Sequence, residues 1–234
     1  MSSMLSNSEA WYNVSKAEME LLETVDVDFL RKVLNAPRST PKEVLFLEMG
    51  VLPFREILIK KRISFLHQIL NEEKDSIMYR FLQTQLKSMS SKDWITQVLK
   101  DIKDINLNLS LEEIKVMKKS ELKKILKKMV ADVAFERLQK LKENHSKVIN
   151  LKYHKLEMQM YLKASQHKLK QEDAQMIFNL RSRMTEVKIN YRGSYETLEC
   201  EACKENEESQ LHLTECKEIV KLRKEYRQPP EYSK

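Results

Sequence analysis

Four potential metal ligands lie near the end of the sequence in the spacing C-x2-C-x8-H-x3-C. They are Cys200, Cys203, His212 and Cys216, and they include all three cysteines of the 234 residues. Three thiolates and an imidazole are the ligand set of a closed tetrahedral zinc site, which leaves no position for a substrate water. The pattern therefore predicts one structural Zn²⁺. Free thiols in a reducing compartment remain an alternative, and the odd cysteine count disfavours a disulfide framework.

Positive charge is concentrated in the middle of the chain. Residues 115–170 hold 16 Lys and Arg against 5 Asp and Glu, so this segment carries an excess of +11 in a protein of net charge +7. Six of its lysines recur at three- and four-residue spacing and would share one helix face: Lys118, Lys119, Lys123, Lys124, Lys127 and Lys128. Such a row matches a nucleic-acid backbone without reading sequence, although a merely solvated helix face is the alternative.

Further cations and aromatic residues could extend this surface towards the cysteines. The cations are Lys147, Lys152, Lys155, Arg181 and Arg183. Tyr153, Tyr161 and Tyr191 could stack on unpaired bases, but such aromatic side chains are more often half-buried packing residues. The expected partner is RNA or DNA, bound through its backbone.

Composition points to an all-α protein. Only 2 glycines and 5 prolines occur, whereas charged residues make up 33% of the chain, which favours helices over strands. No apolar stretch approaches the roughly 20 residues that span a bilayer. The N-terminus has neither the basic start nor the apolar block of a signal peptide. We therefore expect no membrane partner and a nuclear or cytoplasmic protein that is not secreted.

Capping signals locate several helix ends. Ser15 with Glu18 forms a capping box, as does Ser110 with Glu113, and Gly50 is expected to end a helix in the left-handed conformation. The expected helices cover about 16–36, 41–49, 53–70, 75–87, a stretch from 92, a short stretch after 110, 120–143, 152–164 and 171–184. The inward stripe of the first is expected to be Leu22, Val25, Phe29, Leu30 and Val33.

These elements suggest four parts in chain order. Residues 1–89 form a compact helical bundle, and residues 90–190 form a longer, more basic helical region. Residues 191–220 carry the cysteine cluster, and residues 221–234 form a disordered tail.

Two strings in the sequence resemble the C-terminal part of non-LTR (LINE-type) retrotransposon reverse transcriptases. The run from SEAWYNVSKAEMELL to STPKEVLFLEMGVLPFREILIKKRISFLHQIL is similar to the segment that follows the polymerase palm in that family. FNLRSRMTEVKINY, followed by CEACKENEESQLHLTEC, resembles the stretch that leads into its C-terminal CCHC zinc knuckle. The two strings lie towards opposite ends of the sequence, so the resemblance extends over nearly the whole length of the chain.

The resemblance implies a thumb-like helical bundle that would grip a primer–template duplex. Arg55, Lys60, Lys61 and Arg62 would then be phosphate contacts, with a solvated helix as the alternative. The paired aspartates of a Y-x-D-D polymerase turn do not occur, and Asp26 and Asp28 are expected to be surface carboxylates of a helix. No endonuclease motif occurs either. We therefore expect no catalytic residues and no enzyme activity.

The cysteine cluster departs from retroviral knuckles, which have four residues between the second cysteine and the histidine. Here eight residues separate Cys203 from His212, and glutamates surround the cluster. Phosphate would be repelled by these charges, so a structural role for the zinc is favoured over RNA contact.

Three hypotheses about function follow. The first is a non-catalytic, nucleic-acid-binding remnant of a retrotransposon reverse transcriptase. The second is a zinc-stabilised helical module that binds a protein partner, and the third is an expressed relic without selected function.

Overall fold

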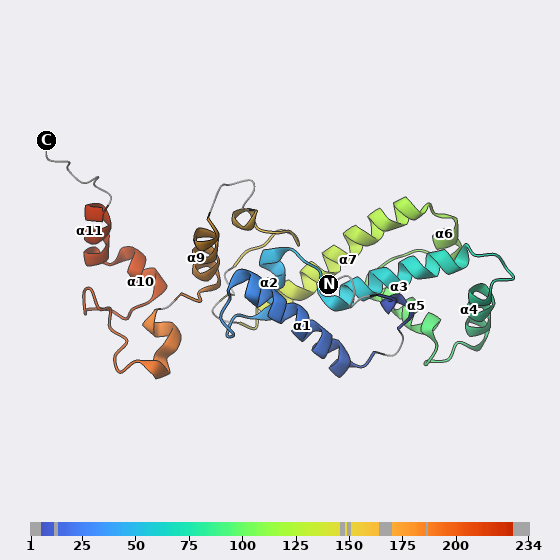
Figure 1. Cartoon of the computed structure of the whole chain (residues 1–234), viewed down its shortest axis with the longest axis horizontal. Helices are drawn as coiled ribbons and strands as arrows, with labels where there is room; N and C mark the ends of the chain where they lie inside the picture. The colour runs from blue at the N-terminus through green and yellow to red at the C-terminus, as the bar shows by residue number, and fades with distance from the viewer. Residues whose placement is uncertain are drawn as a thin grey trace.

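The chain forms an elongated helical molecule in the computed structural model, which describes residues 6–11, 14–145, 148, 151–163, 170–185 and 187–226 (Figure 1). The helices are η1 (Ser8–Ala10), α1 (Lys16–Leu34), α2 (Lys42–Met49), α3 (Phe54–Leu70), α4 (Ile77–Ser88), α5 (Trp94–Asp104), α6 (Leu111–Val116), α7 (Lys119–Lys142), η2 (Met160–Leu162), α9 (Gln171–Ser182), η3 (Lys188–Ser194), α10 (Gln210–Glu215) and α11 (Lys217–Tyr226). The described residues contain no β-strand, only isolated bridges, which confirms the all-α prediction. None of their helices has the length and apolarity needed to cross a membrane.

Both predicted capping boxes are present. The Ser15 hydroxyl accepts a hydrogen bond from the Glu18 N–H at the start of α1, and the Ser15 N–H donates to the Glu18 carboxylate. Ser110 and Glu113 make the same pair of bonds at the start of α6. Each box satisfies N–H groups that have no partner within the helix, so these two boundaries could be read from local sequence.

Two hydrophobic clusters hold the helices together. The first joins α3, α4, α5 and α6 to the N-terminal half of α7. The second joins α1, α2 and the C-terminal half of α7 to Tyr153 and to Phe178 of α9. Helix α3 contacts α1, α4, α5, α6 and α7, and α7 also packs against α2, so these two long helices run through the centre of the elongated body. Residues before and after position 89 contribute to both clusters.

The expected inward stripe of α1 is wrong in three of its five residues. Val25, Phe29 and Val33 are exposed, whereas Leu30 is buried together with Val27. Helix α1 has apolar residues on two faces, so periodicity alone could not choose between them. The face that packs against α2 and α3 also buries carboxylates.

Two buried carboxylates lie on this inward face of α1. Glu23 pairs with Lys42 of α2, with 2.9 Å between Nζ and Oε2. Asp26 is buried as well, which corrects the expectation of a surface carboxylate, while Asp28 is exposed. Burial, and then the nearby Glu23, raise the pKa of Asp26.

The predicted helix over 152–164 is wrong. Within 151–163 only η2 is helical, and the preceding residues run as an extended segment along the end of α2. Two side chains of α7 donate hydrogen bonds to backbone carbonyls of this segment, which in a helix would accept from backbone N–H groups. Lys142 Nζ donates to the carbonyl of Leu151 (2.6 Å), and the Gln139 side chain donates to the carbonyl of Tyr153 (3.1 Å). Tertiary donors therefore compete successfully with helix formation here.

The predicted disordered tail, residues 221–234, begins too early. Helix α11 continues to Tyr226, so residues 221–226 of the expected disordered tail are helical. Residues 227–234 lie outside the described part of the chain.

Gly50 ends α2 in the left-handed conformation, as predicted, with φ of 61°. A Cβ at this position would overlap the backbone of Glu157 and Met158, because the extended segment crosses the end of α2 here. The Gln159 N–H donates to the Glu48 carbonyl (2.9 Å) beside this crossing. Only glycine meets both the conformational and the steric demand.

Gly50→Ala should lower the free energy of unfolding by about 2 kcal/mol, from left-handed strain and from the backbone overlap. Urea denaturation followed by circular dichroism measures the loss. Gly193→Ala is the matched control and should be nearly neutral, because no atom lies within 4 Å of its added Cβ. Equal stabilities of the two variants would contradict the crossing.

Candidate metal centre and basic surface

The four predicted metal ligands converge in the structure. The sulfur atoms of Cys200, Cys203 and Cys216 and a ring nitrogen of His212 all lie within 4.8 Å of one another, and Cys203 Sγ is 3.3 Å from His212 Nε2. A tetrahedral zinc site would have ligand–ligand distances of about 3.6–3.8 Å, from its bond lengths of about 2.1 and 2.3 Å. This Cys₃His group could therefore bind a metal ion with small adjustments.

Backbone hydrogen bonds shape the turn that carries the first two cysteines. The Cys200 N–H donates to the Asn206 carbonyl (2.8 Å), and the Lys204 N–H donates to the Cys200 carbonyl (2.7 Å). Lys204 is left-handed, with φ of 57°. His212 lies in α10, whose N-cap Ser209 accepts from the His212 N–H (3.0 Å), and Cys216 caps the other end. A tight turn and a short helix thus present the four ligands to one point.

The electrostatics of the group favour a cation. The backbone N–H of Glu205, and then that of Asn206, lower the pKa of Cys203 to about 7. The N–H of Ile219 lowers the pKa of Cys216, but burial and the adjacent sulfurs outweigh it and raise the pKa overall. Three sulfurs crowd together, and a divalent cation would stabilise all of them as thiolates.

The surface beside the Cys₃His group is acidic. A cavity of about 740 Å³ adjoins Cys203, His212 and Cys216. Its charged lining consists of Glu205, Glu207, Glu215, Glu218 and Lys217. Such a surface repels phosphate at close range.

The segment that carries the four metal ligands, residues 200–216, contacts the end of α9. We call it the metal-ligand element. Gln210, the first residue of α10, donates to the Leu180 carbonyl (2.6 Å), and Thr185 donates to the Gln210 side-chain oxygen (3.3 Å). Lys188 also pairs with Glu201, with 3.2 Å between Nζ and Oε1. These contacts place the Cys₃His element at one end of the molecule, next to α9 (Figure 1).

The six lysines predicted to share a helix face are all exposed, and we name them the lysine row: Lys118, Lys119, Lys123, Lys124, Lys127 and Lys128. The opposite face of α7 buries Leu122, Leu126 and Val130 in the first hydrophobic cluster. None of the six makes an ion pair with another described residue. Between residues 118 and 128 the only acidic residue is Glu121, so the stretch carries a net charge of +5.

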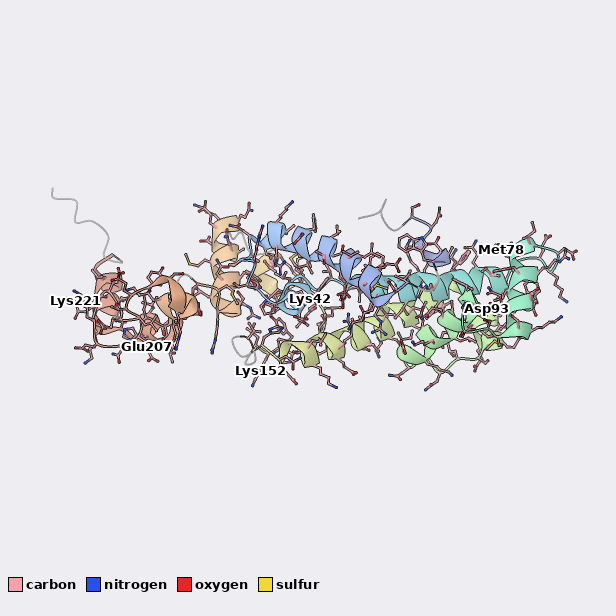
Figure 2. The ribbon with its side chains drawn as sticks, turned by 90° about the horizontal axis from the view of Figure 1, so that it is seen from below. Lys42, Met78, Asp93, Lys152, Glu207 and Lys221 are labelled. Atoms are coloured by element: carbon pink, nitrogen blue, oxygen red, sulfur yellow. The ribbon has the colours of Figure 1, made fainter. Side chains whose placement is uncertain are left out.

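The other five predicted cations do not continue this row as one surface. Lys152 and Lys155 follow the C-terminal end of α7, away from the lysine row (Figure 2 labels Lys152), and Lys155 pairs with Glu157 at 3.0 Å. Arg183 is exposed at the end of α9. Lys147 lies outside the described residues. Arg181 forms an ion pair with the buried carboxylate of Glu48.

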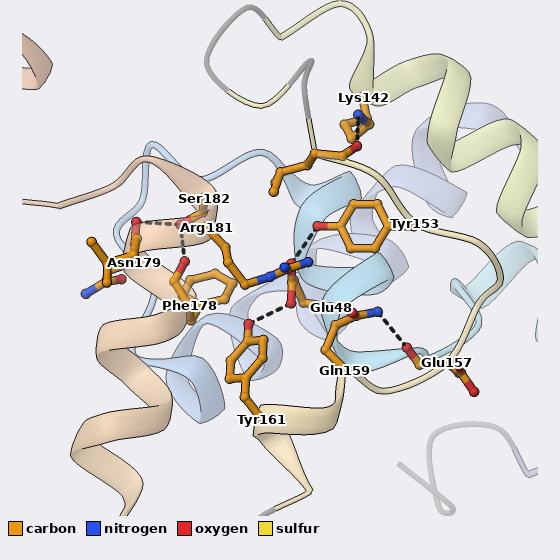
Figure 3. Close-up of polar contacts among 12 residues, drawn as sticks. Glu48, Lys142, Tyr153, Glu157, Gln159, Tyr161, Phe178, Asn179, Arg181 and Ser182 are labelled. Carbon is orange, nitrogen blue, oxygen red and sulfur yellow. Dashed lines mark hydrogen bonds and ion pairs between the residues drawn. The ribbon is translucent and has the colours of Figure 1, made fainter. Parts of the chain in front are cut away.

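Arg181 belongs to a buried network around Glu48, which sequence reasoning missed (Figure 3). The Glu48 side chain is 0% exposed and accepts hydrogen bonds from Tyr153 Oη (2.7 Å), Tyr161 Oη (2.6 Å) and Arg181 Nε (3.0 Å). Burial and the Glu48 charge raise the pKa of both tyrosines. The only local signal was a glutamate inside the apolar run LFLEMG, because a buried carboxylate needs partners.

This network involves three residues that the sequence offered as nucleic-acid contacts. The hydroxyls of Tyr153 and Tyr161 and the guanidinium of Arg181 are held by Glu48, so these residues pin α9 and the extended segment to α2. Tyr153 and Tyr161 therefore have the packing role that was the more frequent alternative to base stacking, and the Arg181 side chain, which is 32% exposed, is held in an ion pair. The side chain of Tyr191, the third predicted stacking residue, lies outside what the structure describes.

The cations expected from a thumb are mostly neutralised within the fold. Arg62 is 4% exposed and bonds to Asp101 Oδ2 (3.1 Å) and to the Trp11 carbonyl (2.9 Å), so it cannot reach a phosphate. Arg55 pairs with Asp104 at 2.9 Å, and Lys61 pairs with Glu9 at 3.3 Å. Lys60 is half-buried.

No family model matches the chain, and neither a curated protein nor a solved structure shows significant similarity to it.

Proposed function

We propose that the protein binds RNA or DNA through its phosphate backbone, using the lysine row of α7, and that it is a non-catalytic remnant of a LINE-type reverse transcriptase. The observation that carries the proposal is the lysine row itself. Six exposed lysines lie along the start of α7, and none of them makes an ion pair with another described residue. Unpaired cations are available to replace the counterions of a polyanion, which is the main source of non-specific affinity.

The lysine row also has suitable dimensions for this role. Ten residues of helix separate its ends, a rise of about 15 Å. Backbone phosphates along one groove edge can therefore contact several lysines at once. The similarity of the strings in residues 8–70 and 178–216 to retrotransposon proteins supports the same class of partner. Contacts of this kind position a protein on nucleic acid without selecting a sequence.

Within this proposal the Cys₃His group holds one structural Zn²⁺. Soft thiolates with an imidazole select zinc among the common divalent ions of cells by ligand type and geometry. All four protein ligands would be used, so the ion would fix the turn and α10 relative to one another. The acidic cavity beside it supports a structural role over phosphate binding.

Lys123→Glu combined with Lys127→Glu should weaken binding to a single-stranded RNA of about 20 nucleotides at least tenfold near 0.1 M salt. Each lost phosphate contact should also reduce the slope of log affinity against log salt by somewhat less than 1, so the slope should fall by about 1.5 in magnitude. Fluorescence anisotropy titrations at several salt concentrations measure both quantities.

The matched control reverses two exposed lysines at the other end of the molecule, Lys170→Glu directly before α9 and Lys221→Glu in α11, for an identical change in net charge (Figure 1). This control should lose much less affinity, because long-range charge effects are screened beyond about 10 Å at 0.1 M salt. If both double variants lose affinity equally, or neither does, the lysine row is not the binding site.

A protein-binding module is the second candidate, favoured by the acidic cavity beside the Cys₃His group. The two candidate functions differ in their salt dependence. A protein complex formed through desolvated apolar contacts persists at high salt, whereas binding of nucleic-acid phosphates by the lysine row does not.

A further inference from the structure

Helix α1 carries a second apolar face that no described element covers. Leu21, Val25, Phe29 and Val33 are 69%, 52%, 53% and 45% exposed, and Leu22 beside them is half-buried. Leu21, Val25, Phe29 and Val33 recur every four residues and so lie in one continuous stripe, which we name the α1 stripe. Single exposed apolar residues are ordinary, but a contiguous stripe of large ones marks an interaction surface.

Charged residues lie on the same face at the two ends of the α1 stripe. Glu18 is exposed near the N-terminal end, and Lys32 is exposed near the C-terminal end. The hydrogen bonds from the Ser15 side chain and backbone lower the pKa of Glu18 and keep it ionised. Lys32 makes no ion pair with another described residue. The face therefore runs from negative through apolar to positive.

The residues of this face are arranged symmetrically about Val25. Leu21 lies four residues before it and Phe29 four residues after, while Glu18 lies seven before and Lys32 seven after. A helix face with this symmetry is complementary to itself in one orientation only, the antiparallel one.

We propose that two copies of the chain pair through their α1 stripes in an antiparallel arrangement, with a two-fold axis at Val25. In this arrangement Val25 meets Val25 of the second copy, Leu21 meets its Phe29, and Glu18 meets its Lys32, with the last two contacts formed twice. Such an isologous contact closes on itself and produces dimers, not filaments. A parallel pair would instead oppose Glu18 to Glu18 and Lys32 to Lys32.

The location of the α1 stripe allows this contact. Helix α1 packs in the second hydrophobic cluster, whereas the half of α7 that carries the lysine row packs in the first, and Figure 1 shows that half at the far end of the body from α9. Pairing through α1 therefore leaves the lysine rows of both copies accessible, and the inference does not depend on the proposed nucleic-acid binding.

The size of the contact sets its strength. A helix of 19 residues is about 28 Å long, and one helix pair buries less than the roughly 1,200 Å² typical of stable complexes. We therefore expect a reversible dimer with a dissociation constant in the range of about 1–100 μM.

Sedimentation velocity of the zinc-loaded full chain, freed of nucleic acid and measured from about 1 to 300 μM, tests the proposal. The wild type should pass from monomer to dimer over this range. Val25→Glu and Val25→Lys should each remain monomeric, because like charges would meet at the two-fold axis, and an equimolar mixture of the two should dimerise again. Val116→Glu, a change of the same kind at a more exposed valine of α6, should dimerise like the wild type.

A charge exchange tests the antiparallel direction. Glu18→Lys and Lys32→Glu should each weaken the dimer about tenfold or more, whereas the chain with both changes should recover most of the wild-type affinity. Circular dichroism verifies that each variant keeps its helices, since Glu18 also belongs to the capping box. A wild type that stays monomeric at 300 μM, a dimer that survives Val25→Glu, or a dimer that Glu18→Lys leaves unchanged would each overturn the arrangement.

Discussion

Replacing Glu48 with alanine will lower the free energy of unfolding by about 3–5 kcal/mol. The change removes the anion of a buried ion pair and leaves two tyrosine hydroxyls and a guanidinium without their acceptor. Because Tyr153, Tyr161 and Arg181 come from the extended segment, η2 and α9, these three elements will detach from α2 before the rest unfolds. Urea denaturation gives the total loss, and hydrogen exchange over residues 151–185 shows where protection disappears.

Two further variants make this result specific. Glu56 is a second buried glutamate, held by Arg137 through two hydrogen bonds of 2.9 Å, so Glu56→Ala should destabilise the bundle without exposing α9 first. Glu48→Gln keeps an acceptor for the tyrosines and should lose roughly half as much stability as Glu48→Ala. The account of the network fails if Glu48→Ala changes stability by less than about 0.5 kcal/mol.

The second large effect concerns the proposed zinc. Elemental analysis should find one zinc per chain, and both a strong chelator and His212→Ala should remove it. Structural zinc sites contribute on the order of 10 kcal/mol to the folding of small elements at neutral pH, so residues 197–220 should lose their hydrogen-exchange protection entirely. Neither hydrophobic cluster includes a ligand of the group, and helices α1 to α7 should therefore stay folded.

His154→Ala is the control for this experiment, since His154 is exposed and lies outside the Cys₃His group. It should bind zinc like the wild type. A purified chain that contains no metal and yet protects residues 197–220 as well as the zinc-loaded protein would show that the four ligands serve another purpose.

Local features of this protein could be predicted from its sequence. The spacing of Cys200, Cys203, His212 and Cys216 brings them together through one turn and one short helix, and no distant contact is needed. The two capping boxes are likewise complete within four residues. The lysine row required only that α7 be a helix with its leucines buried.

Features that depend on distant partners could not be predicted. Glu48 lies 105 residues before Tyr153 and 133 before Arg181, so nothing near Arg181 in the sequence indicated that a carboxylate would remove it from the surface. The helix expected over residues 152–164 does not form for the same reason, because its backbone carbonyls accept hydrogen bonds from Gln139 and Lys142 of α7. Helix α1 offered two apolar faces, and only the positions of α2 and α3 decided which one is buried.

The last turn of α9 has a consequence for how binding and folding are connected in this chain. Leu180 accepts a hydrogen bond from Gln210 of the metal-ligand element, and the next residue, Arg181, pairs with Glu48 of α2. If a cation bound to the Cys₃His group orders α10, these contacts would let it favour the docked position of α9 as well. Since linked equilibria are reciprocal, docking of α9 would then raise the cation affinity of the group by the same factor. The concentration of free metal ion in the cell would then affect how firmly α9 is docked on α2, through this one helical turn.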